Sequence, residues 1–292
     1  MYGNYIVDTH VHFYDPRRTG GIPWPKPDDK LLYRPMMPTA FQEIVDPLGI
    51  TGCIAIESSP NFDDNLWLLE TALANPIVAG VVANVSPTAP NFGDQLSRLS
   101  GYQLFRGIRI HGPDVSALAA GQAFHALEKL AIQSLPLDVL IDADQLPDVQ
   151  RIARRIPDLK IVINHAAHPR IVDGRVDSVW RDRIAQMRDW PNVFCKYSGF
   201  VEGSVRDRQL DEVSRLLRAT FGVDRLIYAS NWPVCLRGGD YATAFQVAER
   251  FARLLDERSR AKFYWKNAFT VYEWIDRTKR LVTVLGFKGR IG

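Results

Sequence analysis

The sequence predicts an α/β protein of the (β/α)8 TIM-barrel class, distorted, with a long loop after strand one and a C-terminal helix. Short apolar segments rich in Val and Ile alternate with amphipathic segments, as strands covered on both faces alternate with their connecting helices. The sequence holds eight such pairs, the number that closes a TIM barrel through right-handed crossovers. A doubly wound open sheet is the alternative. It needs a glycine-rich phosphate turn after the first strand, and residues 8–12 (Asp-Thr-His-Val-His) contain no glycine.

The first strand is expected to begin at residues 5–7 and to end near His12. Residues 17–38 are rich in Pro and Gly, so they cannot form a helix. Loops longer than about 12 residues are usually functional or disordered, and the aromatic and apolar residues of this one favour an ordered loop. The remaining strands are expected at residues 52–57, 78–85, 106–111, 137–141, 160–165, 193–197 and 225–230.

Amphipathic segments predict the helices between these strands. They are expected at residues 39–48, 63–74, 91–99, 119–133, 145–155, 177–188, 207–221 and 240–255. The aromatic-rich segment 259–274 is expected to form a final helix packed over the barrel. No Gly/Ser linker, internal repeat or low-complexity tract interrupts the alternation, so we expect a single domain over residues 1–292.

The composition is that of an ordinary soluble globular protein, with 46% hydrophobic and 24% charged residues. The net charge of +3 comes from scattered basic residues, which argues against a nucleic-acid or membrane partner. The polar N-terminus lacks a signal-peptide pattern, and apolar runs fall far short of the roughly 20 residues that span a bilayer, so a cytoplasmic location is expected. Three widely spaced cysteines argue against a disulfide framework and are expected to be buried thiols: Cys53, Cys195 and Cys235.

Polar side chains stand at the carboxyl ends of several predicted strands. His10 and His12 lie on one face of an extended chain, roughly 6 to 7 Å apart along the strand. In a TIM barrel the carboxyl ends of all strands meet at one rim, which carries the active site. Histidines, a Glu and an Arg gathered there would be costly without partners, so their convergence predicts a functional site. The strand-end residues are His10, His12, Glu57, Arg109, His111, His165, Lys196, Tyr197, Ser198 and Asn231.

Four motifs resemble a known family. The segments Asp8-Thr9-His10-Val11-His12-Phe13, Asn164-His165-Ala166-Ala167-His168-Pro169, Cys195-Lys196-Tyr197-Ser198-Gly199 and Tyr228-Ala229-Ser230-Asn231-Trp232-Pro233-Val234 follow the order and spacing of the amidohydrolase superfamily. They look most like its sugar-lactonase and dicarboxylate-lactonase branch, often labelled amidohydrolase 2. The resemblance covers nearly the whole chain. It implies a distorted TIM barrel and catalytic residues at His10, His12, His165 and Asn231.

Position 231 departs from the pattern of the family, which usually has Asp there as a metal ligand and as the base for the attacking water. An amide cannot accept a proton near neutral pH and is a poor ligand for Zn²⁺. Activity is therefore in doubt. The chain is a natural variant with another base, a degenerate enzyme, or a deliberately changed protein. If geometry is otherwise kept, Asn231→Asp should raise the rate of hydrolysis or tighten Zn²⁺ binding.

The resemblance implies a hydrolase that opens a small organic-acid or sugar lactone by water attack. The alternatives are a metal-dependent decarboxylase of the same superfamily, or a barrel that has lost catalysis and binds a small acid. The expected partner is a small molecule, anionic or polyhydroxylated, and a homo-oligomer is left open. For the cofactor, either His10, His12 and His165 hold Zn²⁺ or another divalent metal, or there is none.

Arg109 is the best candidate for holding a substrate carboxylate or carbonyl, because its planar fork matches two oxygens at once. The alternative for Arg109 is a structural ion pair with Glu57 inside the barrel. His125 and His168 belong to no partner motif of their own and are expected to be structural. The residues expected to bind substrate are Arg109, Glu57, His111, Lys196, Trp24 and Trp232.

Overall fold

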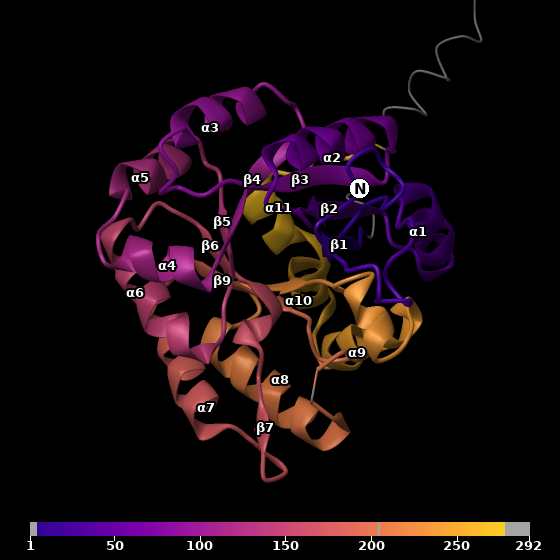
Figure 1. The fold of residues 1–292 in the computed structure, drawn as a ribbon. Coiled ribbons are helices and arrows are strands. Elements are labelled where there is room, and N and C mark those ends of the chain that lie inside the picture. Colours follow the sequence, from indigo (N-terminus) through magenta and orange to yellow (C-terminus); the bar gives the residue numbers. More distant parts are fainter. Residues whose placement is uncertain (1–4, 204, 278–292) are drawn as a thin grey trace, which may run out of the picture.

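The computed structural model describes residues 5–203 and 205–277. Eight parallel strands form one sheet in the order β1-β2-β3-β4-β5-β6-β9-β10, which follows the chain from start to end (Figure 1). The predicted barrel is confirmed, and each predicted strand is present. The strands are β1 (Val7–Val11), β2 (Gly52–Ile56), β3 (Val78–Asn84), β4 (Phe105–His111), β5 (Leu137–Leu140), β6 (Ile161–Ile163), β9 (Val193–Tyr197) and β10 (Leu226–Tyr228).

The barrel closes between β1 and the residues that follow β10. Instead of a regular ladder, Asn231 N donates to His10 O at 3.0 Å and His12 N donates to Trp232 O at 2.8 Å. Val11 forms an isolated parallel bridge with Trp232. The closing seam of this distorted barrel therefore runs through residues that the sequence placed in the functional site.

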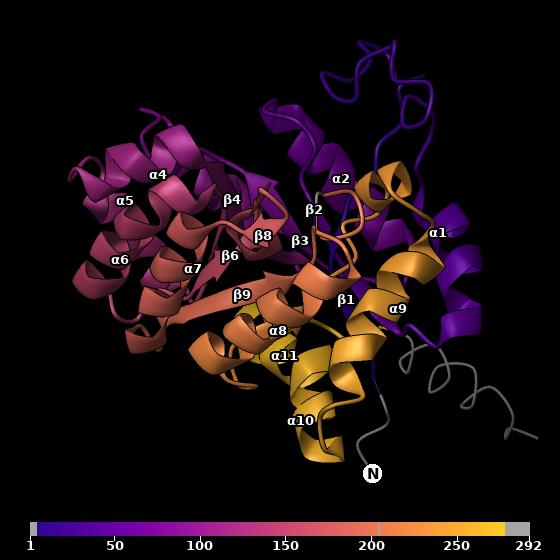
Figure 2. The same cartoon turned by 90° about the horizontal axis from the view of Figure 1, so that it is seen from below.

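Helices surround the strands in both views of the ribbon (Figures 1 and 2). They are α1 (Pro38–Val45), α2 (Phe62–Ala74), α3 (Phe92–Ser100), α4 (Gly112–Ala119), α5 (Phe124–Ile132), α6 (Leu146–Arg155), α7 (Ser178–Ala185), α8 (Asp207–Phe221) and α9 (Tyr241–Ala252). Short 3-10 turns adjoin them: η1 (Asp46–Leu48), η2 (Ala143–Gln145), η3 (Asn164–Ala167), η4 (Gln186–Asp189) and η5 (Val234–Arg237). A small antiparallel hairpin, β7 (Ile171–Val172) with β8 (Arg175–Val176), was not predicted.

Two predicted elements were wrong in extent. The helix expected at residues 119–133 begins only at Phe124 (α5), because Gly121 and Ala123 adopt positive φ angles of 99° and 48°. The helix before it, α4, was not predicted. The strand expected at 160–165 ends at Ile163, since His165 turns into a left-handed conformation with φ 52°. A residue with positive φ interrupts both the helical and the strand repeat of the backbone. Sequence patterns do not reveal such a residue unless it is Gly, Asn or Asp.

The two ends of the barrel carry different elements. The long loop between β1 and α1 projects at the end opposite α10 and α11 (Figure 2). The final helix expected at 259–274 is divided into α10 (Glu257–Ala261), the π-helical η6 (Lys262–Lys266) and α11 (Asn267–Tyr272). Tyr272 of α11 is fully buried and donates to Asp138 Oδ1 at 2.8 Å, so this segment reaches the inside of the barrel.

The long loop is ordered, as predicted. Tyr14 and Met36 exchange backbone hydrogen bonds of 2.8 and 3.0 Å at its base, and Leu32 is completely buried. Arg18 forms an ion pair with Asp64 of α2 and stacks 4.3 Å above the ring of Trp67. The loop is thereby attached to α2, beside the carboxyl ends of the strands.

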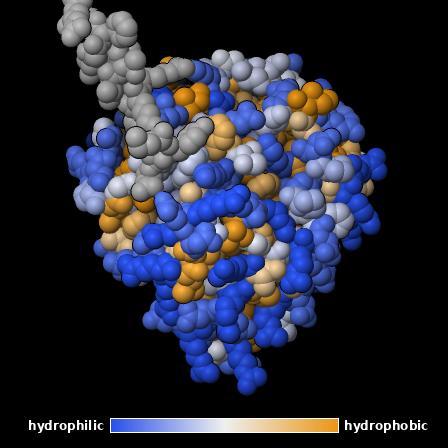
Figure 3. Space-filling model, turned by 180° about the vertical axis from the view of Figure 1, so that it is seen from behind, coloured by the Kyte–Doolittle hydropathy of each residue, from blue (hydrophilic) through white to orange (hydrophobic). Residues whose placement is uncertain are grey.

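The three cysteines are buried and free, as expected. Among the described residues, no helix is long and apolar enough to cross a membrane. The face of the molecule in Figure 3 is mostly hydrophilic, with hydrophobic side chains in small separate groups.

Candidate active site

A cavity of about 830 Å³ opens at the carboxyl ends of the strands. Its wall is formed by strand-end residues and by the loops that follow them. The polar residues on the wall are His12, Glu57, Ser58, Ser59, Asn84, Ser86, Asn91, Gln95, Arg109, His111, Asp114, His165, His168 and Asn231, and the aromatic ones are Trp24 and Phe62. The cavity is large enough for a small organic molecule.

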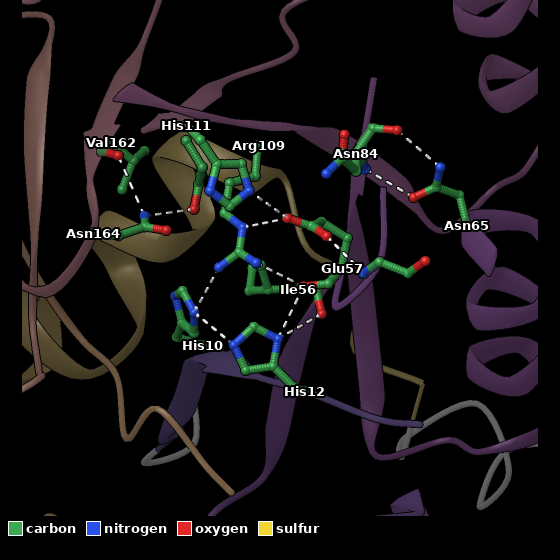
Figure 4. Close-up of polar contacts among 12 residues, drawn as sticks. His10, His12, Ile56, Glu57, Asn65, Asn84, Arg109, His111, Val162 and Asn164 are labelled. Atoms are coloured by element: carbon green, nitrogen blue, oxygen red, sulfur yellow. Dashed lines mark hydrogen bonds and ion pairs between the residues drawn. The ribbon is translucent and has the colours of Figure 1, made fainter. Parts of the chain in front are cut away.

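His12 is held on this wall by β2 and by His10. Its Nδ1 lies 3.1 Å from Ile56 O and 3.0 Å from Glu57 O, so Nδ1 carries the proton and donates (Figure 4). Its Nε2 lies 3.2 Å from His10 Nε2. Because the Nδ1 proton fixes the tautomer, His12 Nε2 presents a lone pair to His10.

His10 lies beneath His12 and is completely buried. Lys196 Nζ is 3.2 Å from His10 Nδ1 and 2.6 Å from Asp138 Oδ2. The ion pair with Asp138 favours the charged lysine, which donates to His10 Nδ1. His10 Nε2 must then carry the proton and donates to His12 Nε2. One chain of hydrogen bonds therefore runs from Lys196 through both imidazoles to the backbone of β2.

The Lys196–Asp138 pair is completely buried, with no exposed side-chain surface on either partner. A buried ion pair is tolerated only when further hydrogen bonds satisfy its remaining atoms. Asn164 Nδ2 donates to Asp138 Oδ2 at 3.0 Å, and Tyr272 OH donates to Oδ1 at 2.8 Å. Elements from three parts of the chain thus meet in the barrel to support one lysine.

Arg109 and Glu57 form a second buried pair. Arg109 Nε donates to Glu57 Oε1 at 2.7 Å and Nη2 donates to Glu57 O at 2.8 Å, which leaves Nη1 3.4 Å from His10 Nε2 (Figure 4). His111 Nε2 is 3.4 Å from the same carboxylate oxygen. Burial alone raises the pKa of Glu57, but the charge of Arg109 and hydrogen bonds from His111 and Arg109 lower it to about 2. The ion pair that the sequence offered as an alternative role for Arg109 is therefore present.

The three site histidines are neutral at neutral pH. Burial, followed by the charge of Arg109, lowers the pKa of His12 to about 3. Burial and Lys196 lower the pKa of His10 well below its ordinary value. Burial, His168 and Lys196 do the same for His165. The cationic form of each ring is disfavoured chiefly because the ring is buried, and the nearby cations Lys196 and Arg109 add to this effect.

His165 comes from the sharp turn η3, in which His165 and the three residues after it all have positive φ. Its Nδ1 is 2.9 Å from Ser198 Oγ. The turn packs against the segment after β9, where a Cβ on Gly199 would lie 2.6 Å from His165 Cβ. Gly199 thus permits the close approach that fixes His165 on the wall.

Asn231 lies at the barrel seam, across from His10 of β1, and is 5% exposed. Its backbone is bonded to His10, and its Nδ2 donates to Glu202 Oε1. Burial raises the pKa of Glu202 above its ordinary value, although the hydrogen bond from Asn231 opposes this shift. Sequence reasoning did not select Glu202, because it stands in a loop without periodicity.

Asp8 is a scaffold for the seam and does not line the cavity. It accepts hydrogen bonds from His10 N at 3.1 Å, Ser230 N at 2.9 Å and Tyr241 OH at 2.9 Å. Burial raises its pKa despite these donors. The carboxylate joins β1 to the residues that follow β10 and to α9.

The structure places most of the predicted site residues together, with three differences. Lys196 was expected to bind substrate, but it lies beneath the cavity because its ammonium is committed to Asp138 and His10. Trp232 is 2% exposed and packs its ring against Phe13 and Phe41 instead of the cavity. His10 is likewise absent from the cavity wall and reaches it through His12.

Several wall residues were not selected from the sequence. Asn84 ends β3, where Asn65 of α2 holds its backbone with hydrogen bonds of 2.8 and 2.9 Å (Figure 4). The position of Asn84 at a strand end could have identified it as a site residue from the sequence. His168, expected to be structural, also lines the cavity. The wall residues Ser58, Ser59, Ser86, Asn91, Gln95 and Asp114 come from loops and helix starts whose placement depends on the whole fold.

A metal ion would need several of these donor atoms to converge on one point. Within residues 5–203 and 205–277, no group of three or more His, Cys, Asp or Glu is arranged to hold one. A metal-bound histidine donates its other ring N–H to a carbonyl, carboxylate or water. His12 meets this condition, but His10 Nδ1 faces the ammonium of Lys196, and Arg109 adds a second cation. The histidines therefore do not fit a metal ion in this arrangement.

Comparisons with known proteins identify the family and agree with the fold. A family model described as amidohydrolase matches residues 7–274. An L-fucono-1,5-lactonase of Burkholderia ambifaria is 31% identical over 284 residues, covering 93% of this chain and 96% of that protein. A Burkholderia multivorans amidohydrolase, solved with bound Zn, aligns with TM-score 0.82 and 25% identity over 93% of this chain and 100% of its own. A 2,6-dihydroxybenzoate decarboxylase from Rhizobium aligns with TM-score 0.68 and 15% identity over 92% of this chain and 98% of its own, which shows the fold alone.

The neutral histidines predict acid sensitivity. His12 has a pKa of about 3 in the folded protein, below its ordinary value of 6.5. Its contribution to stability is therefore complete above pH 6.5 and is lost as the pH falls toward 3, because the unfolded chain takes up the proton first. Each such histidine adds up to about 1.4 kcal/mol per pH unit to the slope of the unfolding free energy.

We expect His12→Asn to make this slope shallower between pH 6.5 and 4, measured by chemical denaturation at several pH values. The matched control is His125→Asn, which changes an exposed histidine on α5 and should leave the slope unchanged. Equal slopes for His12→Asn and the unchanged protein would show that His12 is not held neutral.

Proposed function

Because the chain belongs to the amidohydrolase family, we propose that it is a hydrolase that opens neutral sugar lactones in the cavity at the strand ends. The observation that carries the choice of substrate is the charge of the wall. Arg109 is the one Lys or Arg among the described wall residues, and its guanidinium is already paired with Glu57. Asp114 adds a further carboxylate. A dianionic substrate would find no free cation, whereas a polyhydroxylated lactone is electrically neutral.

The wall offers the contacts that a polyhydroxylated ring requires. Uncharged hydrogen-bonding side chains follow β2 and β3, and Trp24 and Phe62 supply apolar surface for the faces of the ring. Amides and hydroxyls both donate and accept, as sugar hydroxyls do. The uncharged donors and acceptors are Ser58, Ser59, Asn84, Ser86, Asn91 and Gln95.

Arg109 polarises the lactone carbonyl. Two of its nitrogens hold Glu57, so the third, Nη1, is the donor left for the carbonyl oxygen. The buried pair fixes the guanidinium before substrate arrives, and a preorganised donor stabilises the charge that develops on the oxygen. Burial keeps His10 and His12 neutral beside it, with the charge of Lys196 adding to the effect at His10 and that of Arg109 at His12, so that neither ring competes for that charge.

A neutral histidine takes the proton of the attacking water. Glu57, with a pKa of about 2 and an arginine partner, is a poor base, and Asp8 does not reach the cavity. His165 lines the cavity, and its Nδ1 is 2.9 Å from Ser198 Oγ. We assign the ring proton to Nδ1 as the donor to this oxygen, which leaves the Nε2 lone pair for water. Water oxygen bonds to the carbonyl carbon while His165 takes one proton. The ring C–O bond then breaks, and the ring oxygen takes that proton to give the hydroxy acid.

The decarboxylase alternative fits the site less well. It requires a metal ion as an electron sink, and the donors described above do not fit one in their present arrangement. The other alternative is a barrel that binds a small acid without catalysis. The following experiment distinguishes it from a hydrolase.

Acid release in a pH-stat should occur with neutral aldonolactones, beginning with L-fucono-1,5-lactone. For a pyrone dicarboxylate of similar size we expect kcat/KM at least about tenfold lower, because the dianion meets carboxylates without a free cation. The same rates are expected after treatment with a chelator. A preference for the dianion would contradict the assignment of substrate, and binding of lactones without acid release would favour the non-catalytic barrel.

Arg109→Lys should lower kcat on lactones by about 10² to 10³, since lysine can keep the pairing with Glu57 but lacks the Nη1 donor. Its unfolding free energy should change much less than that of Arg109→Met, which leaves Glu57 buried without a partner. Steady-state kinetics with chemical denaturation measures both quantities. A kcat within about twofold of the unchanged protein would remove Arg109 from the role of carbonyl donor.

A further inference from the structure

The contact between Asn231 and Glu202 is not used by the chemistry described so far. The Asn231 backbone is fixed at both ends, because its N–H donates to His10 O at 3.0 Å and its O accepts from Cys235 N at 3.0 Å. Its side-chain Nδ2 donates to Glu202 Oε1. Asn231 Oδ1 and Glu202 Oε2 are buried and have no hydrogen-bond partner among the described residues.

Glu202 determines which way the amide of Asn231 is turned. An ionised carboxylate only accepts hydrogen bonds, so the amide must turn its NH₂ group toward Glu202. The amide oxygen then points away from Glu202, and Asn231 is a cavity residue. Oδ1 is therefore a buried acceptor without a protein partner, in a residue that lines the cavity, and such an atom calls for a donor.

Two close backbone contacts hold Glu202 in place. A Cβ on Gly238, after η5, would lie 1.9 Å from Val201 O and 3.0 Å from Glu202 N. On the other side, Gly199 packs against His165. The segment that carries Glu202 is thereby fitted between η5 and the turn that carries the proton acceptor His165.

The surroundings of Glu202 leave its charge uncompensated. No Lys or Arg in the described parts of the chain forms an ion pair with it, and the titratable groups facing it are His168 from the turn after η3 and Cys235 from η5. A half-buried carboxylate without a cation is costly, and such groups are retained where they serve a site.

We propose that Glu202 is a positioning residue of the hydrolytic site, which fixes the Asn231 amide so that Oδ1 accepts a hydrogen bond from the attacking water. The proposal rests on the proposed lactone hydrolysis. Asn231 Oδ1 and His165 together orient the water, one by accepting its second hydrogen and the other by taking the proton. Glu202 acts through Asn231 and does not touch the substrate.

Two substitutions of Glu202 separate positioning from simple support. Glu202→Met has similar length and no acceptor, so the amide is released, and kcat should fall by about 10² with KM within about twofold. Glu202→Gln keeps one acceptor oxygen and should recover part of this loss, to about tenfold below the unchanged protein. Glu70→Gln, on the exposed side of α2, is the matched control and should be without effect. Equal kcat in Glu202→Met and the unchanged protein overturns the proposal.

Exchanging the amide and the carboxylate between positions 231 and 202 gives a second readout, the pH dependence of kcat/KM. Asn231→Asp places two carboxylates in contact, which raises the apparent pKa of the pair and should move the acidic limb of kcat/KM toward neutral pH. Combining it with Glu202→Gln restores one amide and one carboxylate and should return the limb to lower pH. A merely structural contact would leave the pH profile in place, and that result overturns the proposal.

A measurement without turnover separates this proposal from the proposed function. The side-chain NH₂ signals of Asn231 in a ¹⁵N NMR spectrum should shift as Glu202 titrates, and the shift should be absent in Glu202→Met. Loss of the pH-dependent shift supports positioning even if every lactone tested is inert, an outcome that would overturn the hydrolase alone. Identical titration of the NH₂ signals in both proteins overturns positioning alone.

Discussion

The buried ion pair between Lys196 and Asp138 is the interaction on which the site depends. Without it the lysine would lose its charge in the barrel, and His10 would have no donor at Nδ1. The pair is supported from η3 by Asn164 and from α11 by Tyr272. The C-terminal segment at the closed end of the barrel thus contributes to the protonation state of a histidine at the open end.

The order of strands and the convergence of polar residues followed from local patterns. Strand periodicity correctly placed Arg109 inside the barrel, and the four motifs correctly indicated the family. What failed was local backbone geometry. The break at Ala123 and the turn at His165 use positive φ in residues that rarely adopt it.

The placement of side chains by the tertiary fold was the second feature that could not be predicted from the sequence. The sequence put Lys196 at a strand end, but whether it met substrate or Asp138 depended on the register of β9 against the strands around it. Glu202 gave no signal in the sequence, because it lies 29 residues before its partner Asn231. Asn231 therefore looked like the loss of an acid, whereas a carboxylate stands directly beside it.

The most direct test of the account is the tautomer of the two strand-one histidines, read from ring nitrogen shifts in ¹⁵N NMR at neutral pH. The hydrogen-bond chain from Lys196 predicts neutral rings, with the proton on Nε2 in His10 and on Nδ1 in His12. Specific labelling or comparison with His12→Asn assigns the signals. A His10 ring protonated at Nδ1, or a cationic ring at either position, would contradict the account, because Lys196 would then not be the donor that organises the site.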